Sequence, residues 1–413
     1  MTEVRVHVQL GGRTVAAGVA YFTVGRGGVS TTFVYDPAYL ANREGHDLEP
    51  AMPRRSGQQY TDALPRSFAD CAPDRWGRSL IDKRRRALQG QAPQRLPSAT
   101  EIDYLLGVSD LTRQGALRFT VGDGPFLDPQ DAVPKLVSLP RLLAAADEVE
   151  SKDTQDDLAA VKALLDAGSG SLGGARPKAS VRGNDGALLI AKFPHRDDEW
   201  DVMAWEKTAL DLAESAGLRV PRRRLTKVGA RNVLLIDRFD RGPQGTRRGY
   251  ISAMTLLEAR DGDERDYVDI AEGLSENGAQ VNDDLAELFS RVAFNVAIHN
   301  TDDHLRNHGF LRSPGGWSLS PVFDVNPNPD LGRRRVTSVA GVVDVDGEVD
   351  ALPVLAQECR LSAPRTRAAV GRVHAAVSQW RAVSAANGVA TAEQHAFAEV
   401  FAHGLGALEA ISG

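Results

Sequence analysis

The chain begins with an alternation of hydrophobic and polar residues that predicts β-strands. Val4, Val6 and Val8 alternate with polar residues in "VRVHVQL", and a Gly11-Gly12 turn separates this segment from "TVAAGVAYFTV". A glycine-rich turn at 25–28 then leads into "STTFVY". Because a period of two places one side of each strand against a core, residues 1 to about 40 are expected to form a β-meander.

From about residue 60 to about 150 the apolar residues recur at helical spacing instead. The helical stretches "RWGRSLIDKRRRAL" and "LPRLLAAADEVES" are interrupted by "GALRFTVGDGPF", which is typical of a strand followed by a loop. A further helix is expected in "TQDDLAAVKALLDAG". Thr154 would cap it, Asp157 would complete a capping box, and Gly168 would end it.

The next block has the order β-β-α-β-β, which describes a small lobe. "KASVRG" and "ALLIAKFP" flank a turn at 184–186, and the helix "DEWDVMAWEKTALDLAESAGL" ends in glycine and leucine. The strands "RRRLTKVG" and "NVLLIDRFDR" follow it. Helices dominate from about residue 250, with "YVDIAEGLSE" and "NDDLAELFSRVAFNVAI" before a hairpin formed by "GFL" and "WSLSPVF".

Composition narrows the class of protein without naming a function. The chain has 413 residues, of which 42% are hydrophobic and 25% charged, and contains no apolar run of membrane-spanning length. We therefore expect a soluble, cytoplasmic protein of two or more subdomains that binds no membrane. A net charge of -6 argues against a general nucleic-acid binder. Cys71 and Cys359 are expected to be inert thiols.

The window "IHNTDDHLRNHGFL" at 298–311 holds the densest set of polar side chains and allows two kinds of chemistry. His304 and His308 could bind zinc if they lay on one helix. Asp302 and Asn307 have the D-x-x-x-x-N spacing of a kinase catalytic loop, which predicts phosphoryl transfer. Since the chain turns into a strand near Gly309, helical geometry is broken there and phosphoryl transfer is favoured. His299 and His308 are then expected to be ordinary hydrogen-bonding residues.

Other segments carry the remaining parts of such a site. The glycine-rich loop "GSGSLGGARPKAS" at 168–180 could offer backbone N–H groups to phosphate. Lys192 ends a buried-looking strand and could bind the α- and β-phosphates, with Glu206 as its partner on the next helix. The segment from Asp237 to Phe239 could flank an adenine base. Asp324, one hairpin after Asn307, could complete a magnesium site.

Taken in order, these segments resemble the HipA family, the serine/threonine kinase toxins of bacterial type II toxin-antitoxin systems. The resemblance rests on "NTDDHLRNHGFL", "WSLSPVFDVNP", "SLGGARPK", "LLIAKFP", "DRFDR", "FADCAPDRWGR" and "GVSDLTRQGALRF". It implies an α+β, protein-kinase-like fold with a β-rich N-terminal subdomain at 1–125, a small-lobe-like region at 126–245 and an all-helical C-terminal lobe at 246–413.

The resemblance also implies a role for each site residue, with ATP and magnesium (Mg2+) as cofactors. Asp302 would be the catalytic base, with His304 and Arg306 beside it in the catalytic loop. Asn307 and Asp324 would bind magnesium. Ser171 would be the autophosphorylated serine, whose phosphate would repel ATP and bind Arg176 or Lys178 instead. The residues that would bind ATP are Ser171, Gly173, Gly174, Ala175, Lys178, Lys192, Glu206, Asp237 and Phe239.

The partners implied by the family are a HipB-like helix-turn-helix antitoxin, operator DNA bound through that antitoxin, and a protein substrate. In the better known members the substrate is an aminoacyl-tRNA synthetase. Three alternatives stay open from the residues alone. They are a phosphotransferase acting on a small molecule, a catalytically silent subunit that binds an antitoxin and DNA, and a zinc hydrolase.

Overall fold

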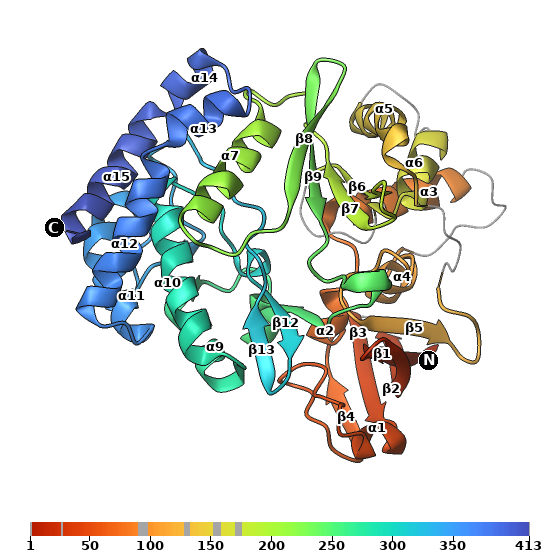
Figure 1. Cartoon of the computed structure of the whole chain (residues 1–413). Helices are drawn as coiled ribbons and strands as arrows, with labels where there is room; N and C mark the ends of the chain where they lie inside the picture. Colours follow the sequence, from red (N-terminus) through yellow and green to blue (C-terminus); the bar gives the residue numbers. More distant parts are fainter. Residues whose placement is uncertain are drawn as a thin grey trace. The chain divides into compact units, whose positions relative to one another are not determined.

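The computed structural model of the chain describes residues 2–25, 28–89, 98–127, 133–151, 158–169 and 176–412. These residues group into two compact units (Figure 1). Unit 1 contains residues 1–197 and 226–251, and unit 2 contains residues 198–225 and 252–413.

The first sheet of unit 1 confirms the predicted meander. Its strands run in the order β4-β3-β2-β1-β5, with antiparallel neighbours. Val4, Val6 and Val8 face the core as the alternation predicted, where they join Phe33 and Phe119. The strands are β1 (Thr2–Leu10), β2 (Arg13–Gly25), β3 (Gly28–Tyr35), β4 (Gln58–Thr61) and β5 (Leu117–Val121), accompanied by the short helices α1 (Pro37–Ala41), α2 (Arg66–Ala69) and α4 (Glu101–Leu106).

A second sheet in unit 1 has the order β6-β7-β9-β8 and packs against helices. Trp76 and Leu80 of α3 share its core with Leu143 of α5 and Leu164 of α6. The predicted region boundary at residue 125 stays a prediction, and this core extends across it. The elements are β6 (Lys178–Arg182), β7 (Leu188–Lys192), β8 (Arg223–Val228), β9 (Arg231–Asp237), α3 (Arg75–Gln89), η1 (Leu136–Ser138), α5 (Leu139–Glu150), α6 (Leu158–Asp166) and η3 (Pro243–Gly245).

Unit 2 is built around α10 (Val281–Ala297), which packs against α9, α11, α12 and α15. Figure 1 shows α10, α12 and α15 side by side. On α7, the ring of Trp205 stacks on Phe397 at 4.1 Å between centroids. The other helices are α7 (Val202–Ser215), α8 (Ala253–Leu256), α9 (Tyr267–Asn277), α11 (Glu348–Glu358), α12 (Ala363–Val377), α13 (Trp380–Ala386), α14 (Thr391–Ala396) and α15 (Ala398–Ser412).

The α+β class is confirmed, but the C-terminal lobe is not helical throughout. The hairpin expected after residue 308 is present as β12 (Gly309–Ser313) and β13 (Gly316–Leu319). A short parallel pair, β11 (Arg265–Asp266) and β14 (Thr337–Ser338), was not predicted, because two-residue strands leave no periodic signal. Strand β10 (Tyr250–Ser252) precedes α8, and the 3-10 turns are η4 (Leu305–Asn307) and η5 (Val345–Gly347). Among the described helices, none is both long and apolar enough to cross a membrane.

Two glycines of α15 provide a matched test of how closely this helix approaches α10. A Cβ on Gly404 would lie 2.4 Å from the carbonyl oxygen of Ala297, whereas a Cβ on Gly406 would meet nothing within 4 Å. We expect Gly404→Ala to lower the free energy of unfolding by about 1–3 kcal/mol through overpacking. Gly406→Ala should raise it by about 0.5–1 kcal/mol through helix propensity. Urea denaturation measures both, and a stabilising Gly404→Ala would contradict this packing.

Candidate functional site

The polar window forms a loop between α10 and β12 in unit 2. Helix α10 ends at Ala297, and His299 then adopts a positive φ of 54°, which turns the chain out of the helix. The N–H of Asn300 donates to the carbonyl oxygen of Asn295 at 2.9 Å. The Nε2 of His299 lies 2.9 Å from the carbonyl oxygen of Asp330, so this histidine is hydrogen-bonded as expected.

Asp302 and Asn307 are linked within this loop. Asp302 is exposed, whereas Asn307 is buried. The Nδ2 of Asn307 donates to the backbone oxygen of Asp302 at 3.2 Å. Since this bond uses the nitrogen end of the amide, the Oδ1 end is the one that could bind a cation.

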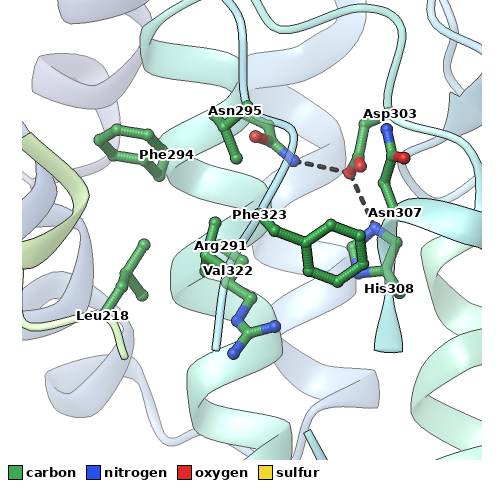
Figure 2. Close-up of a pocket in the computed structure, with 10 residues that line it drawn as sticks. Leu218, Arg291, Phe294, Asn295, Asp303, Asn307, His308, Val322 and Phe323 are labelled. Carbon is green, nitrogen blue, oxygen red and sulfur yellow. Dashed lines mark hydrogen bonds and ion pairs between the residues drawn. The ribbon is translucent and has the colours of Figure 1, made fainter. Parts of the chain in front are cut away.

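Asp303 has the opposite environment to its neighbour Asp302, since only 5% of it is exposed. Its Oδ2 accepts hydrogen bonds from the hydroxyl of Tyr267 at 2.6 Å and from Nδ2 of Asn295 at 2.7 Å. The Nε2 of His308 lies 2.8 Å from the same oxygen. Figure 2 shows Asn295 and His308 converging on Asp303 at the wall of a small pocket. Burial alone would raise the pKa of Asp303, but the charge and hydrogen bond of His308 outweigh it, so that this pKa lies below its usual value.

The β12–β13 hairpin brings the chain back to this loop. Phe310 pairs with Leu319, and the N–H of Ser320 donates to the carbonyl oxygen of Gly309 at 2.8 Å. Phe323 and Asn307 line the same pocket, as Figure 2 shows, so Asp324 directly follows a residue that lies at this site. Asp324 has a positive φ of 57°, a strained conformation that is often retained where function requires it.

The donors in this part of unit 2 suit magnesium better than zinc. Asn307 and Asp324 offer amide and carboxylate oxygens, which are the ligands that magnesium prefers. His304 lies at the start of η4 in an extended conformation, and His308 is already bonded to Asp303, so no helix aligns the two. Throughout the described ranges, no group of three or more His, Cys, Asp or Glu side chains could hold a metal ion. The zinc reading therefore has no support in the geometry.

Arg306, predicted for the catalytic loop, is exposed and forms an ion pair with Asp261. Its Nη2 lies 3.0 Å from Oδ2 of Asp261. By contrast, Arg335, the last of three consecutive arginines at 333–335, is buried, where it pairs with Glu348 and donates to the carbonyl oxygen of Asn300 at 2.8 Å. Arg335 thus stabilises the loop from inside and does not add to a basic surface.

In unit 1, the two predicted phosphate-binding lysines lie opposite each other. Lys178 of β6 pairs in register with Lys192 of β7, and only 2% and 8% of these residues are exposed. The Nζ of Lys178 lies 2.9 Å from Oδ2 of Asp74, which neutralises the charge of Lys178. Both lysines are held on the sheet, and Lys178 is committed to an ion pair that the sequence did not reveal.

The end of β9 alternates between buried and half-buried residues. Asp237 and Phe239, predicted to lie beside adenine, are half-buried, whereas Arg238 and Asp240 are buried. Asp240 accepts from Nη2 of Arg238 at 2.6 Å, from Nη1 of Arg241 at 2.6 Å and from the N–H of Gly115 at 2.8 Å. Burial would raise the pKa of Asp240, but the two arginine charges outweigh it and hold this pKa well below its usual range.

The remaining predicted residues are placed differently or lie outside the described part. Glu206 is buried on α7 in unit 2, whereas Lys192 belongs to unit 1, and their predicted pairing stays a prediction. Arg176 is described and half-buried. Thr154 and Asp157, and the loop residues Ser171, Gly173, Gly174 and Ala175, lie outside the described residues.

The sequence patterns did not single out two buried aspartates that lie beside predicted site residues. Asp303 directly follows the predicted residue Asp302, and Asp240 directly follows the predicted residue Phe239. A signal was available, since Asp303 and His308 repeat the five-residue spacing of Asp302 and Asn307. Burial, which depends on the fold, separates the exposed Asp302 from the buried Asp303.

Asp240 should contribute strongly to the stability of unit 1. Asp240→Asn leaves two buried arginines without their counter-charge, so we expect it to lower the free energy of unfolding by about 3–5 kcal/mol. The control is Asp123→Asn, which breaks an ion pair with Arg5 in which the aspartate side chain is 86% exposed. That change should cost about 0–1 kcal/mol. Equal losses in guanidinium denaturation would contradict the role given to Asp240.

The contribution of Asp303 to the free energy of unfolding should depend on pH in the acidic range. Because its pKa is lowered by folding, its stabilising effect is complete above the usual carboxyl pKa of about 3.9 and is lost as the pH falls through the lowered value. The difference in free energy of unfolding between wild type and Asp303→Asn should therefore shrink as the pH falls below the usual carboxyl pKa of about 3.9 and through the lowered pKa of Asp303. Parallel pH curves for the two proteins would rule this out.

Comparison with known proteins gives the geometry a family context. Residues 13–100 match the model of the HipA N-terminal domain, and residues 170–380 match that of the HipA-like C-terminal domain. The serine/threonine-protein kinase toxin HipA of Shewanella oneidensis MR-1 is 25% identical over 183 residues. That alignment covers 38% of this chain and 42% of the Shewanella protein.

A solved structure extends the likeness over the whole chain. It belongs to the complex of HipA, HipB and operator DNA from the toxin-antitoxin system of Shewanella oneidensis MR-1. The match has a TM-score of 0.68 at 14% identity and covers 98% of this chain and 96% of that one, which shows a shared fold. Since one family model alone spans residues 170–380 and another spans residues 13–100, the chain belongs to the HipA family.

Proposed function

We propose that this chain is an ATP- and magnesium-dependent serine/threonine protein kinase that acts as the toxin of a HipA/HipB-like toxin-antitoxin module. The observation that carries the proposal is the loop in unit 2, where exposed Asp302 is joined to Asn307 by a 3.2 Å hydrogen bond. An exposed carboxylate suits a general base, and the hydrogen bond through Nδ2 of Asn307 leaves its Oδ1 as the atom that would bind a cation.

Nucleotide binding is proposed for residues of unit 1. Lys192 supplies a buried positive charge at the end of β7 for the α- and β-phosphates. Asp237 and Phe239 flank the base, and the proposed loop contacts are Ser171, Gly173, Gly174 and Ala175. Lys178, which forms an ion pair with Asp74, is proposed to bind the phosphates beside Lys192.

In the proposed transfer, the hydroxyl oxygen of a substrate serine or threonine attacks the γ-phosphorus of ATP. The carboxylate of Asp302 accepts the proton of that hydroxyl. The bond between the γ-phosphorus and the bridging oxygen breaks, and ADP leaves. Asn307 and Asp324 would hold magnesium, which when bound neutralises phosphate charge. His304 and Arg306 would orient the γ-phosphate, and binding it requires Arg306 to leave Asp261.

Regulation and partners follow from the family. Autophosphorylation of Ser171 would add about two negative charges beside the ATP phosphates and repel the nucleotide. Arg176 or Lys178, which follow Ser171 closely in the sequence, would bind that phosphate instead. The proposed partners are a HipB-like helix-turn-helix antitoxin, operator DNA through that antitoxin, and a protein substrate such as an aminoacyl-tRNA synthetase.

Removing the base should abolish chemistry while leaving the fold intact. Because Asp302 is exposed, Asp302→Ala should change the free energy of unfolding by less than about 0.5 kcal/mol. The rate of phosphoryl transfer from labelled ATP should fall by about a hundredfold or more, and growth arrest on expression should be relieved. Asp324→Ala should also abolish transfer. Arg334→Ala, which breaks an exposed ion pair with Asp344, is the control and should leave transfer unchanged.

The class of acceptor is decided by incubating wild type and Asp302→Ala with labelled ATP and cell lysate. A labelled protein other than the enzyme, present only with wild type, would support a protein kinase, and mass spectrometry would identify it. Label in a small molecule alone would favour the small-molecule phosphotransferase. Growth arrest that persists in Asp302→Ala after loss of ATP turnover would contradict a toxin that acts through its kinase activity.

A further inference from the structure

The loop that carries Asp302 contains two interleaved residue pairs with the same spacing. Asn307 donates to the backbone of Asp302, and one residue later His308 bonds to the side chain of Asp303 at 2.8 Å. The first pair is the one proposed for chemistry. The second is turned inward, with 5% of Asp303 and 3% of His308 exposed.

Asp303 connects this loop to several elements of unit 2. Tyr267 begins α9, Asn295 lies in the last turns of α10, and both donate to its Oδ2. The hydroxyl of Thr337 in β14 donates to its backbone oxygen at 2.6 Å. A residue held by both its side chain and its carbonyl oxygen has little freedom to rotate, and Asp302 is joined to Asp303 by a peptide bond.

The donors are themselves fixed, which makes the arrangement rigid. The Oδ1 of Asn295 accepts from Nδ2 of Asn300 at 3.1 Å, so this one amide holds both the start of the loop and Asp303. Tyr267 follows Asp266, whose side chain caps α9 and accepts from the N–H of Gly341 at 2.7 Å. The carboxylate of Asp303 therefore lies in a preorganised set of donors, as a group that fixes a catalytic geometry requires.

We propose that Asp303 is a positioning residue for phosphoryl transfer: its buried carboxylate holds the loop at 298–308 so that Asp302 and Asn307 keep their relative places. The inference rests on the proposed kinase function. A positioning role differs from a purely structural one. Loss of a purely structural carboxylate would lower only the fraction of the protein that is folded. Loss of a positioning carboxylate also lowers the rate of transfer in each folded molecule, because a small displacement of the catalytic base slows the reaction.

The experiment uses the full chain and two changes of graded severity. Tyr267→Phe removes one donor and keeps the charge of Asp303, whereas Asp303→Asn removes the charge. The matched control is Tyr35→Phe, which removes a buried hydroxyl that donates to the carbonyl oxygen of Met52, also at 2.6 Å. For each protein we would measure transfer from labelled ATP per folded molecule, the Kd for magnesium-ATP by calorimetry, and amide hydrogen exchange.

We expect Tyr267→Phe to lower transfer per folded molecule by about tenfold and Asp303→Asn by about a hundredfold, with the Kd for magnesium-ATP unchanged. Exchange of amides at 298–309 should rise in both variants. Tyr35→Phe should change neither transfer nor exchange in this segment. Unchanged transfer per folded molecule in Tyr267→Phe and Asp303→Asn, or a loss matched by a weaker Kd, would overturn the proposal.

Failure of the proposed function would be recognised separately. If wild type transfers no phosphate from ATP, the kinase function fails, whatever the variants do. Exchange then still tests whether Asp303 holds the loop. A rise confined to 298–309 in Asp303→Asn would support that anchoring, and unchanged exchange there would refute it.

Discussion

The loop in unit 2 depends on one carboxylate oxygen, Oδ2 of Asp303, on which three donors converge. A buried charge is costly unless it is paired and hydrogen-bonded, and here the tyrosine, amide and imidazole meet that requirement together. Because the donors come from α9, α10 and His308, the residue before β12, satisfying this charge fixes where those elements lie within the unit. The exposed Asp302 is held in place by its neighbour.

The same division between adjacent residues occurs at the end of β9 in unit 1. There Arg238 and Asp240 are buried and bonded, while Asp237 and Phe239 remain half-buried. Burial thus alternates from Asp237, the last residue of β9, through the turn that follows, so one set of side chains can anchor the chain while the other meets a ligand. Asp240 also accepts from the N–H of Gly115, which lies in the N-terminal motif "GVSDLTRQGALRF". This gives the N-terminal motif a physical role, since it supplies a backbone donor to the turn after β9.

Charge pairing also distinguishes residues that the sequence presents as equivalent. Lys178 and Lys192 occupy opposite positions on β6 and β7, and Lys178 forms a buried ion pair with Asp74, which lies 104 positions away in the sequence. The arginines of the cluster at 333–335 differ in the same way, because Arg335 is buried against Glu348 whereas Arg334 forms an exposed pair. A run of basic residues therefore does not define a surface until the fold has chosen which charges are paired internally.

Periodicity in the sequence was sufficient for the elements that bury a regular face. It predicted the meander of β1 to β3, helices α9 and α10, and the β12–β13 hairpin, since alternation and helical spacing are local properties of the chain. The family resemblance supplied the α+β class and the membership that the comparisons confirmed. Local periodicity could not reveal the parallel β11–β14 pair or the ion pair of Lys178 with Asp74, because the partners in each pair are distant in sequence.

The window "NTDDHLRNHGFL" shows where the sequence by itself stopped and tertiary structure decided. The sequence determined that Asp302 and Asn307 have the spacing of a phosphoryl-transfer loop and that a hairpin leads on to Asp324. It could not tell which of two adjacent aspartates is exposed, since Asp302 and Asp303 are chemically identical. Only the packing of α9 and α10 around the loop placed Tyr267 and Asn295 against Asp303, which buried that charge and left Asp302 in solvent.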